Sequence, residues 1–244
     1  MLKIGRTLCA YCGARHRLVE GCATLWIFDR EHSYNRRMQY PTVSPRHLEG
    51  IARELHERTG TSAPVDAFRL AALLGFACKP WGRGGGSIDL RTKVIRYSAA
   101  AAETTQHGIV CHELFHYALG RAGEDDRDEE ACRYGAGALL LPLSPFKADS
   151  FRLSFDLEAV RELHPNASGQ MVCVRFAQVS PVSTSVWDHG HEKASYGPAI
   201  DRDLAAGLVW QVLDTGLAVR GEVSAFPLFT GSWRRVIVVD RRAA

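Results

Sequence analysis

The stretch ETTQHGIVCHELFHYAL, residues 103–119, contains the motif HELFH at residues 112–116. Apolar residues recur through it at helical spacing, so we expect the whole stretch to form one long helix. On a helix, His112 and His116 are four residues apart and lie on one face, about 6 Å from each other. Two imidazoles in that arrangement can bind one metal ion, and zinc suits them.

The residue that follows the first histidine is Glu113, and we expect its carboxylate to point beside the metal. A carboxylate in that place can take a proton from water and later pass it to the leaving amine. A bound metal would lower the pKa of that water toward ~7 and polarise the scissile carbonyl. The motif therefore predicts peptide-bond hydrolysis, with Glu113 as the general base. A pattern with three fixed positions also arises by chance, but the length of the helix and its apolar opposite face argue against chance here.

A catalytic zinc needs a third protein ligand. In the metzincin class of peptidases, a glycine follows the second histidine by three residues and a ligand histidine follows three residues later. Leu119 and Ala122 occupy those positions, which excludes that class. The segment RAGEDDRDEEACRYGAGALLLP, residues 121–142, offers carboxylates instead. They are Glu124, Asp125, Asp126, Asp128, Glu129 and Glu130.

Helical periodicity distinguishes these acids. A helix is expected from about 128 to 141, and Cys132 and Ala136 lie on its buried face with Leu139 or Leu140. Glu129 precedes Cys132 by three residues and therefore faces the same interior, whereas Glu130 is rotated from it by about 100°. We predict Glu129 as the third ligand, with Glu130 as the alternative.

Together these residues resemble the ImmA/IrrE family of metallopeptidases. The family pattern is a helix with HELGH followed by a helix of the form ExxANxFAxxLLMP. HELFH matches the first part, and EEACRYGAGALLLP, residues 129–142, aligns with the second, including its closing LLLP. Phe115 stands in place of the usual glycine, Gly135 in place of the aromatic residue, and Cys132–Arg133 in place of Ala-Asn. These departures predict different packing under the site.

The resemblance extends over roughly residues 46–188 and implies a specific function. Members of the family are zinc-dependent proteases with a narrow substrate, often a helix-turn-helix repressor in a stress-response or mobile-element switch. The resemblance implies Zn²⁺ as the cofactor, with Mn²⁺ as an alternative activating metal. It also implies the third ligand, Glu129, that periodicity selects. The expected partner is a protein substrate, without direct binding to nucleic acid.

The remaining sequence predicts an α+β fold in three parts. Residues 1–44 form a Cys-containing segment, 45–180 a zincin-like metallopeptidase domain, and 181–244 a small α+β module for sensing or substrate binding. Helices are expected after the N-caps Ser44 and Asp66, and at 103–119, 128–141, 156–163, 168–178 and 201–213. Strands are expected at 76–81, 87–90, 93–97, 182–187, 217–229 and 233–239.

The first segment contains CAYCGARHRLVEGC, whose spacing approaches that of a zinc knuckle. Cys9, Cys12, His16 and Cys22 could therefore hold a second, structural zinc ion. Free thiols in a tail are the alternative. A nucleic-acid-binding protein built on these cysteines is a third hypothesis, which the modest charge of the chain disfavours.

Composition limits the classes of protein that fit. The 244 residues are 46% hydrophobic, enough for a core without disulfides, and the net charge of +3 is not gathered into a block. No apolar window approaches the ~18 residues of a membrane helix. The N-terminus lacks the ~7–15 apolar residues of a secretory signal. Seven cysteines, an odd number, include buried-type single thiols from residue 78 onward, so we place the protein in the cytoplasm.

Several further residues stay open at this stage. Six could stabilise an oxyanion, and the sequence does not choose between Tyr117, His164, Arg175, His189, His191 and Tyr196. His107 is expected to cap or pack, and Cys111 and Cys132 to be core thiols.

The main rival function is a non-catalytic, metal-binding regulatory protein that acts through a partner. Glu113 argues against it, because a purely structural site needs no base.

Overall fold

The computed structural model describes residues 43–120, 126–216, 218–230 and 233–242, with two short strands before them, β1 (Thr7–Leu8) and β2 (Arg15–His16). The thiols of Cys9, Cys12 and Cys22 and the imidazole of His16 lie outside the described residues, as do Glu124 and Asp125 and the side chains of Asp126 and Asp128. The predicted second zinc site is therefore not tested.

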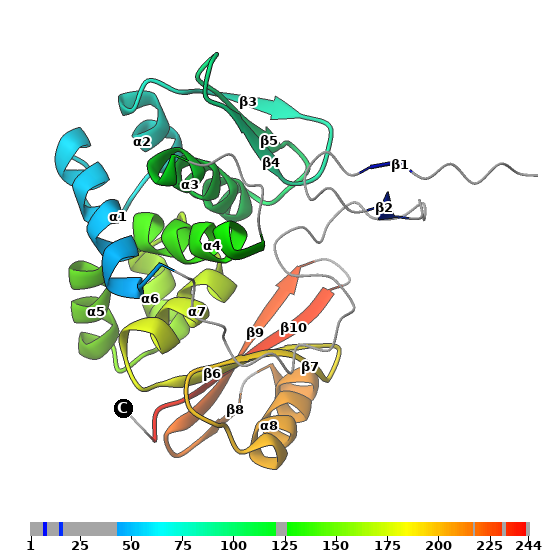
Figure 1. Cartoon of the computed structure of the whole chain (residues 1–244). Coiled ribbons are helices and arrows are strands. Elements are labelled where there is room, and N and C mark those ends of the chain that lie inside the picture. Colours follow the sequence, from blue (N-terminus) through cyan, green and yellow to red (C-terminus); the bar gives the residue numbers. More distant parts are fainter. Residues whose placement is uncertain are drawn as a thin grey trace, which may run out of the picture.

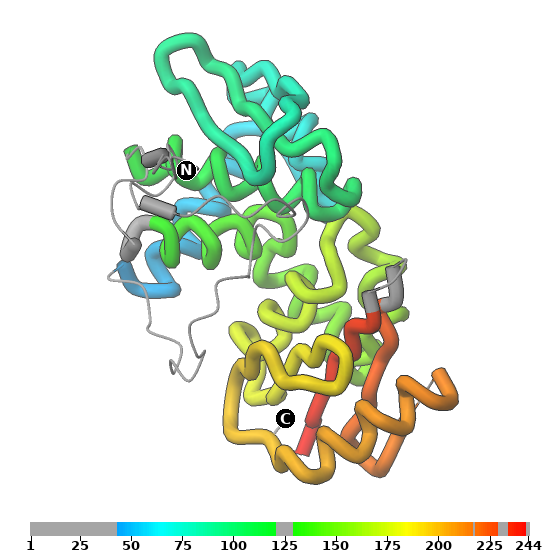
Figure 2. Tube along the Cα trace, turned by 90° about the vertical axis from the view of Figure 1, so that its right-hand side faces the viewer, coloured from blue at the N-terminus to red at the C-terminus, as the bar shows by residue number. Residues whose placement is uncertain are grey.

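The chain folds into helices with a sheet at either end, and both views show the two sheets at opposite ends of the molecule (Figures 1 and 2). The first half contains α1 (Pro45–Thr59), α2 (Ala67–Leu73), β3 (Ala77–Trp81), β4 (Gly86–Asp89), β5 (Val94–Ser98) and α3 (Glu103–Leu119). Four helices follow, α4 (Asp126–Leu140), α5 (Leu143–Arg152), α6 (Leu157–Leu163) and α7 (Gly169–Val179). The last part contains β6 (Ser183–Asp188), β7 (His191–Tyr196), α8 (Arg202–Thr215), β8 (Ala218–Arg220), β9 (Val223–Thr230) and β10 (Trp233–Asp240). The predicted α+β class is confirmed.

The first two helices begin where their caps predict. The Ser44 hydroxyl accepts a hydrogen bond from the backbone N–H of His47, and Asp66 accepts bonds from two N–H groups of α2. Gly60 ends α1 in the left-handed conformation that glycine adopts without strain. Local sequence therefore fixes both ends of α1 and the start of α2.

The smaller sheet has the strand order β3-β5-β4, with β3 and β5 parallel and β4 antiparallel to β5. Its inner face packs on the helices, and Ile95 on the central strand is fully buried. Strand β4 is an edge strand and contacts α3. This placement brings one edge of the sheet beside the HELFH helix.

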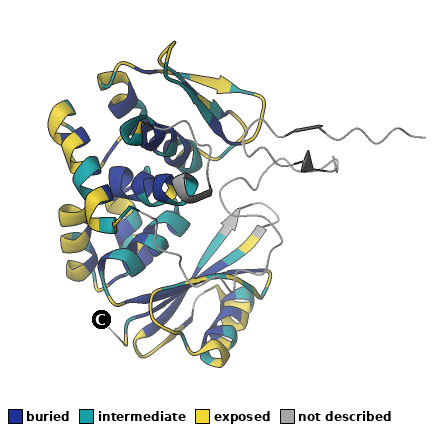
Figure 3. Cartoon of the chain, in the orientation of Figure 1, coloured by how far each residue is buried: buried dark blue, intermediate teal, exposed yellow. Residues whose placement is uncertain are grey.

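The larger sheet is antiparallel, with the order β7-β6-β10-β9-β8. Helix α7 packs on one face and α8 on the other. In β10, Ile237 and Val239 join the main core, while Val236 and Val238 join a second cluster with α8. Both faces of the central strands are thus buried (Figure 3).

The structure differs from the predictions at three places in the second half. No helix was predicted between residues 141 and 156, yet α5 begins at Leu143, because a proline such as Pro145 is tolerated in a first helical turn. Strand β7 was not predicted; it follows a tight turn at His189–Gly190, where both residues have positive φ. The strand expected at 217–229 is divided by a turn at residues 221–222 into β8 and β9.

No helix among the residues that the structure describes has the length and apolar character needed to cross a membrane. Cys111, Cys132 and Cys173 are buried as reduced thiols, as expected, and Cys78 is a partly buried reduced thiol. A fully buried side chain, Arg175 of α7, ties the helices together. It donates to both carboxylate oxygens of Glu49 on α1 and to the carbonyl of Leu141.

Candidate metal centre

The HELFH segment lies in the second half of α3, where His112 and His116 occupy one face of the helix. Their Nε2 atoms are 3.1 Å apart, and the two ring planes meet at 78°. The side chain of His116 is 5% exposed and that of His112 14%. Both imidazoles therefore direct Nε2 toward a common point near the surface.

Helix α4 brings Glu129 to the same point. One carboxylate oxygen lies 3.3 Å from Nε2 of His112 and the other lies 3.3 Å from Nε2 of His116. The neighbouring Glu130 instead pairs with Arg133, one turn along α4. Periodicity thus selected the acid that the fold brings to the histidines, and not its alternative.

The three side chains fit a tetrahedral metal site. Ligand atoms at the usual zinc distance of about 2.0–2.1 Å would be separated by roughly 3.3–3.4 Å in a tetrahedron. The closest contacts between the three residues are 3.1, 3.3 and 3.3 Å, and their donor atoms all lie within 4.8 Å of one another. Three protein ligands leave the fourth position open, as in catalytic sites.

Electrostatics favours an ionised Glu129. Burial by itself would raise its pKa, but hydrogen bonds and charge interactions with His112 and His116 outweigh burial and hold the pKa far below the ordinary value. The site therefore presents a carboxylate anion beside two imidazoles at any physiological pH.

Glu113 is buried, with 2% of its surface exposed, and its side chain lies against the start of β4. A Cβ atom added to Gly86 would come within 2.8 Å of Oε1 of Glu113 and within 2.5 Å of Ile109. Only a glycine fits at this point of the strand without displacement. Gly86, which lies between two predicted strands in the segment GRGGGS (residues 82–87), was not among the predicted site residues, although it borders the proposed base.

Cys132 was expected to be a core thiol, but its side chain also contacts a residue of the candidate site. Its Sγ lies 3.2 Å from Nδ1 of His116. When Nδ1–H donates to sulfur, Nε2 keeps its lone pair, which is the form of the imidazole that binds a metal. The thiol therefore helps to orient His116.

Two departures from the family pattern meet in space. The ring of Phe115 lies directly over Gly135 of α4, and a Cβ at Gly135 would fall within 2.2 Å of that ring. Phe115 itself is fully buried. An aromatic ring on α3 therefore fills the space between the helices, which requires the glycine on α4.

Most of the other candidates have separate roles. His164 packs on Phe146 and lies 3.3 Å from Asp149, while Arg175 binds Glu49. Tyr117 packs on Phe76, with the Lys93 ammonium over its ring. The remaining candidates belong to the β6–β7 hairpin of the larger sheet, namely His189, His191 and Tyr196. His107 caps α2, because its Nδ1 accepts from the N–H of Ala67.

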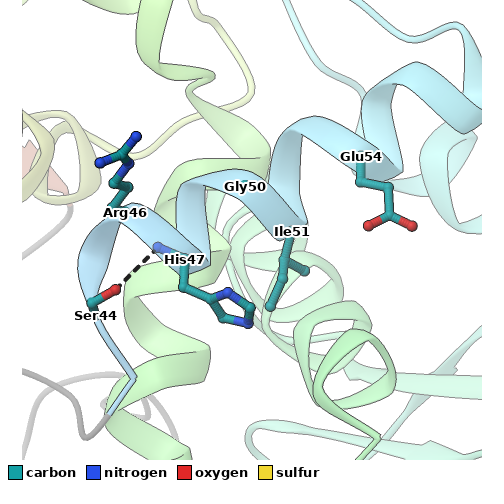
Figure 4. Close-up of a pocket in the computed structure, with 6 residues that line it drawn as sticks. All are labelled: Ser44, Arg46, His47, Gly50, Ile51 and Glu54. Carbon is teal, nitrogen blue, oxygen red and sulfur yellow. Dashed lines mark hydrogen bonds between the residues drawn. The ribbon is translucent and has the colours of Figure 1, made fainter.

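A shallow hollow lies elsewhere, along the N-terminal half of α1 (Figure 4). It is lined by Ser44, Arg46, His47, Gly50, Ile51 and Glu54. None of the three residues that converge on α3 and α4 lines it, so the hollow is separate from the metal centre.

Comparison with known proteins agrees with this geometry. Residues 79–181 match the IrrE N-terminal-like domain, from β3 to just beyond α7. No curated protein gives a significant match. Among solved structures, a Mycobacterium tuberculosis transcriptional regulator is similar in fold, with a TM-score of 0.59 and 13% identity over 80% of this chain and 76% of that one. The chain therefore carries, at residues 79–181, the IrrE N-terminal-like domain of the ImmA/IrrE metallopeptidase family.

Proposed function

We propose that the protein is a zinc-dependent metallopeptidase of the cytoplasm that hydrolyses a peptide bond in one regulatory protein. The substrate is a helix-turn-helix repressor, and its cleavage operates a stress-response or mobile-element switch. The observation that carries the proposal is the position of Glu129, whose two carboxylate oxygens lie 3.3 Å from the Nε2 atoms of the two HELFH histidines.

In this proposal His112, His116 and Glu129 hold the metal, Zn²⁺ or alternatively Mn²⁺. When bound, the metal would activate water for attack and polarise the scissile carbonyl. The donor set supports zinc, which favours imidazole and carboxylate ligands in a tetrahedral arrangement. Cys132 orients His116 from the other side of its ring.

Glu113 is the proposed general base. Its carboxylate takes a proton from the attacking water and delivers it to the nitrogen of the leaving amine. The close approach of Gly86 limits where the carboxylate can move. That restriction keeps the proton-transfer group in position between binding and bond cleavage.

The edge of β4 is the proposed binding place for the peptide. An edge strand offers backbone N–H and C=O groups that an extended segment can pair with. Because β4 begins at Gly86, against Glu113, a segment paired with this edge would pass the base. The module formed by residues 181–244 would hold the rest of the substrate or sense a signal.

Three variants test the chemistry. Glu113→Gln should keep one zinc per chain, measured by elemental analysis, and lower cleavage about 10²–10⁴-fold. Glu129→Gln should lose the metal, whereas Glu130→Gln, the neighbouring acid paired with Arg133, should keep both metal and activity. The substrate is a purified helix-turn-helix repressor encoded beside this gene, incubated with Zn²⁺ or Mn²⁺. Cleavage that survives Glu113→Gln would refute Glu113 as the general base, and a repressor left intact by the wild type would refute the enzymatic proposal.

A second candidate is a regulatory protein that keeps the metal site but acts through its partner without cleavage. The fold similarity to a transcriptional regulator favours it. In that case the wild type would leave the repressor intact, and Glu113→Gln would leave regulation in the cell unchanged. Loss of regulation in that variant, with the metal retained, would exclude this candidate.

A further inference from the structure

The outer face of the three-stranded sheet carries two neighbouring cations. Register places Lys79 of β3 directly beside Arg96 of β5, and Ser87 of β4 completes the same row. All three side chains lie on the face away from the helices, because the alternate residues Ile88, Ile95 and Tyr97 face inward. Lys79 and Arg96 are both exposed.

Arg83 extends this face beyond the ends of the strands. Its guanidinium lies 5.9 Å from the centre of the Trp81 ring, and Trp81 shares a face with Lys79, two residues earlier. Arg83 is exposed in the turn that leads into β4. We call Lys79, Arg83 and Arg96 the basic face.

The charges of the basic face are not neutralised within the described part of the chain. No ion pair there involves Lys79, Arg83 or Arg96. The nearest carboxylate along β4 is that of Asp89, which accepts hydrogen bonds from the backbone of Arg91 and Thr92. Like charges directly opposite each other on adjacent strands destabilise a sheet. A binding role accounts for a pair that stability alone disfavours.

The basic face borders the candidate metal centre. Strand β4 lies between the two. On one side of it Gly86 contacts Glu113, and on the other side β4 pairs with β5, which carries Arg96. A peptide paired with β4 would lie about two strand spacings, roughly 10 Å, from the β5 backbone. A long acidic side chain on that peptide and the guanidinium of Arg96 together can span this distance.

We propose that the basic face binds an acidic stretch next to the cleaved bond, so that the substrate is a protein with Asp and Glu near its cleavage site. This inference rests on the proposed function. The chain's own first 42 residues do not fit as the occupant, because they carry seven Lys and Arg against three Asp and Glu. Nucleic acid fits less well than an acidic peptide, because the cations are few and the Trp81 side chain, half-buried and bonded to Gly85, is not free for base stacking.

Binding can be measured without hydrolysis, in the full-length Glu113→Gln protein with zinc. The probe is a fluorescein-labelled 12-residue peptide with alternating Glu, compared with the same peptide carrying Gln. Fluorescence anisotropy should show at least about tenfold tighter binding of the Glu peptide at low salt, and the difference should shrink as salt screens the charges. Equal affinity for the two peptides would overturn the inference.

Charge reversal locates the binding surface. Lys79→Glu/Arg96→Glu should weaken binding of the Glu peptide about tenfold or more, and Lys79→Gln/Arg96→Gln should give an intermediate loss. Lys147→Glu/Arg220→Glu makes the same change in net charge on exposed residues of α5 and β8, and should change affinity less than twofold. Equal loss in this control would overturn the inference.

Two further outcomes are decisive. Tighter binding of a 24-base-pair DNA duplex than of the Glu peptide, lost in the same variant, would assign the face to nucleic acid and overturn the inference. A repressor left intact by the wild type would refute the proposed function, while leaving the charge dependence of binding as measured.

Discussion

The five-stranded and three-stranded sheets of this protein are covered differently. The five-stranded sheet is enclosed by α7 and α8, and all six residues of β6 are buried. Within the described residues, the three-stranded sheet has helices on one face only, and its other face carries Lys79 and Arg96. In that part of the chain the first sheet is a structural layer, whereas the second has an uncovered edge and an uncovered face beside the candidate metal centre.

Buried polar groups follow the same division. In the larger sheet, buried polar groups have hydrogen-bond partners within the protein. Asp188 accepts from Nε and Nη2 of Arg235, and the Thr184 hydroxyl donates to the carbonyl of Cys173. Near the smaller sheet, two imidazoles and a carboxylate converge on one point. Convergent donors of that kind favour a ligand over structural pairing. The difference predicts where substitutions change function and where they change only stability.

The largest expected effect concerns the contact between Phe115 and Gly135. Phe115→Gly leaves a cavity and should lower the free energy of unfolding by about 3–5 kcal/mol, and Gly135→Phe should lower it by about 3 kcal/mol through overpacking. The double variant moves the ring to the other helix and should recover most of the loss, measured by urea unfolding. Gly207→Phe on α8, where an added Cβ meets nothing within 4 Å, is the control and should cost little. If the losses in the free energy of unfolding simply add in the double variant, the two residues do not compensate for each other and the prediction is wrong.

Acid should destabilise the helical part of the molecule, which lies outside the larger sheet. Burial lowers the pKa of His56, His107 and His164, all outside the larger sheet. Each folded pKa lies below the unfolded value of 6.5, so their contribution to stability is complete above pH 6.5 and is lost as pH falls toward the folded pKa. The free energy of unfolding should fall by about 1.4 kcal/mol per pH unit for each histidine.

Urea unfolding between pH 7 and pH 5 measures this slope. His56→Gln, which can still donate to the carbonyl of Leu139, should reduce it. His47→Gln changes an exposed residue of α1 and should leave the slope as it is. Stability that does not fall below pH 6.5 would contradict the prediction.

A smaller effect is expected at the contact between β4 and the proposed base. Gly86→Ala forces Glu113 or Ile109 to move, because the new Cβ would lie within 2.8 Å of both. Cleavage of the repressor should fall about 10²-fold while zinc content stays the same. Gly82→Ala, in the same turn with nothing within 4 Å, should retain activity. Equal activity of the two variants would show that the position of Glu113 is not limiting.

The smallest effect is expected at Cys132. Cys132→Ala removes the partner of Nδ1 of His116 and should weaken zinc binding about tenfold, measured by competition with a chelator. Cys173→Ala, at an equally buried thiol of α7, is the matched control and should leave zinc affinity unchanged. An unchanged affinity in both variants would limit Cys132 to packing.

Much of the fold and of the site could be predicted because the signals are local. The caps Ser44 and Asp66 act within a few residues, and α1 and α2 begin directly after them, as predicted. Glu129 could be distinguished from Glu130 because the period of one helix fixes which face is buried. Helix α5 was missed because a proline that ends one helix can also start the next.

Other features depend on contacts between distant segments and left no local signal. The role of Gly86 arises only when β4 packs on α3, and the contact between Phe115 and Gly135 joins two helices. The strand predicted at 182–187 has the alternation of a half-exposed strand, yet β6 is buried on both faces once α8 covers the sheet. The position of Lys79 beside Arg96 likewise depends on the register of two parallel strands.

The ion pair between Glu49 and Arg175 has a consequence for synthesis of the chain. The two residues are separated by 126 positions, and the pair closes α1 against the end of the family domain. At ordinary translation rates Arg175 leaves the ribosome roughly 6–25 s after Glu49. The histidines of HELFH leave the ribosome about halfway through that interval, when the contact that joins α1 to α7 cannot yet form. A nascent chain would thus present the proposed metal ligands before α1 and α7 are joined.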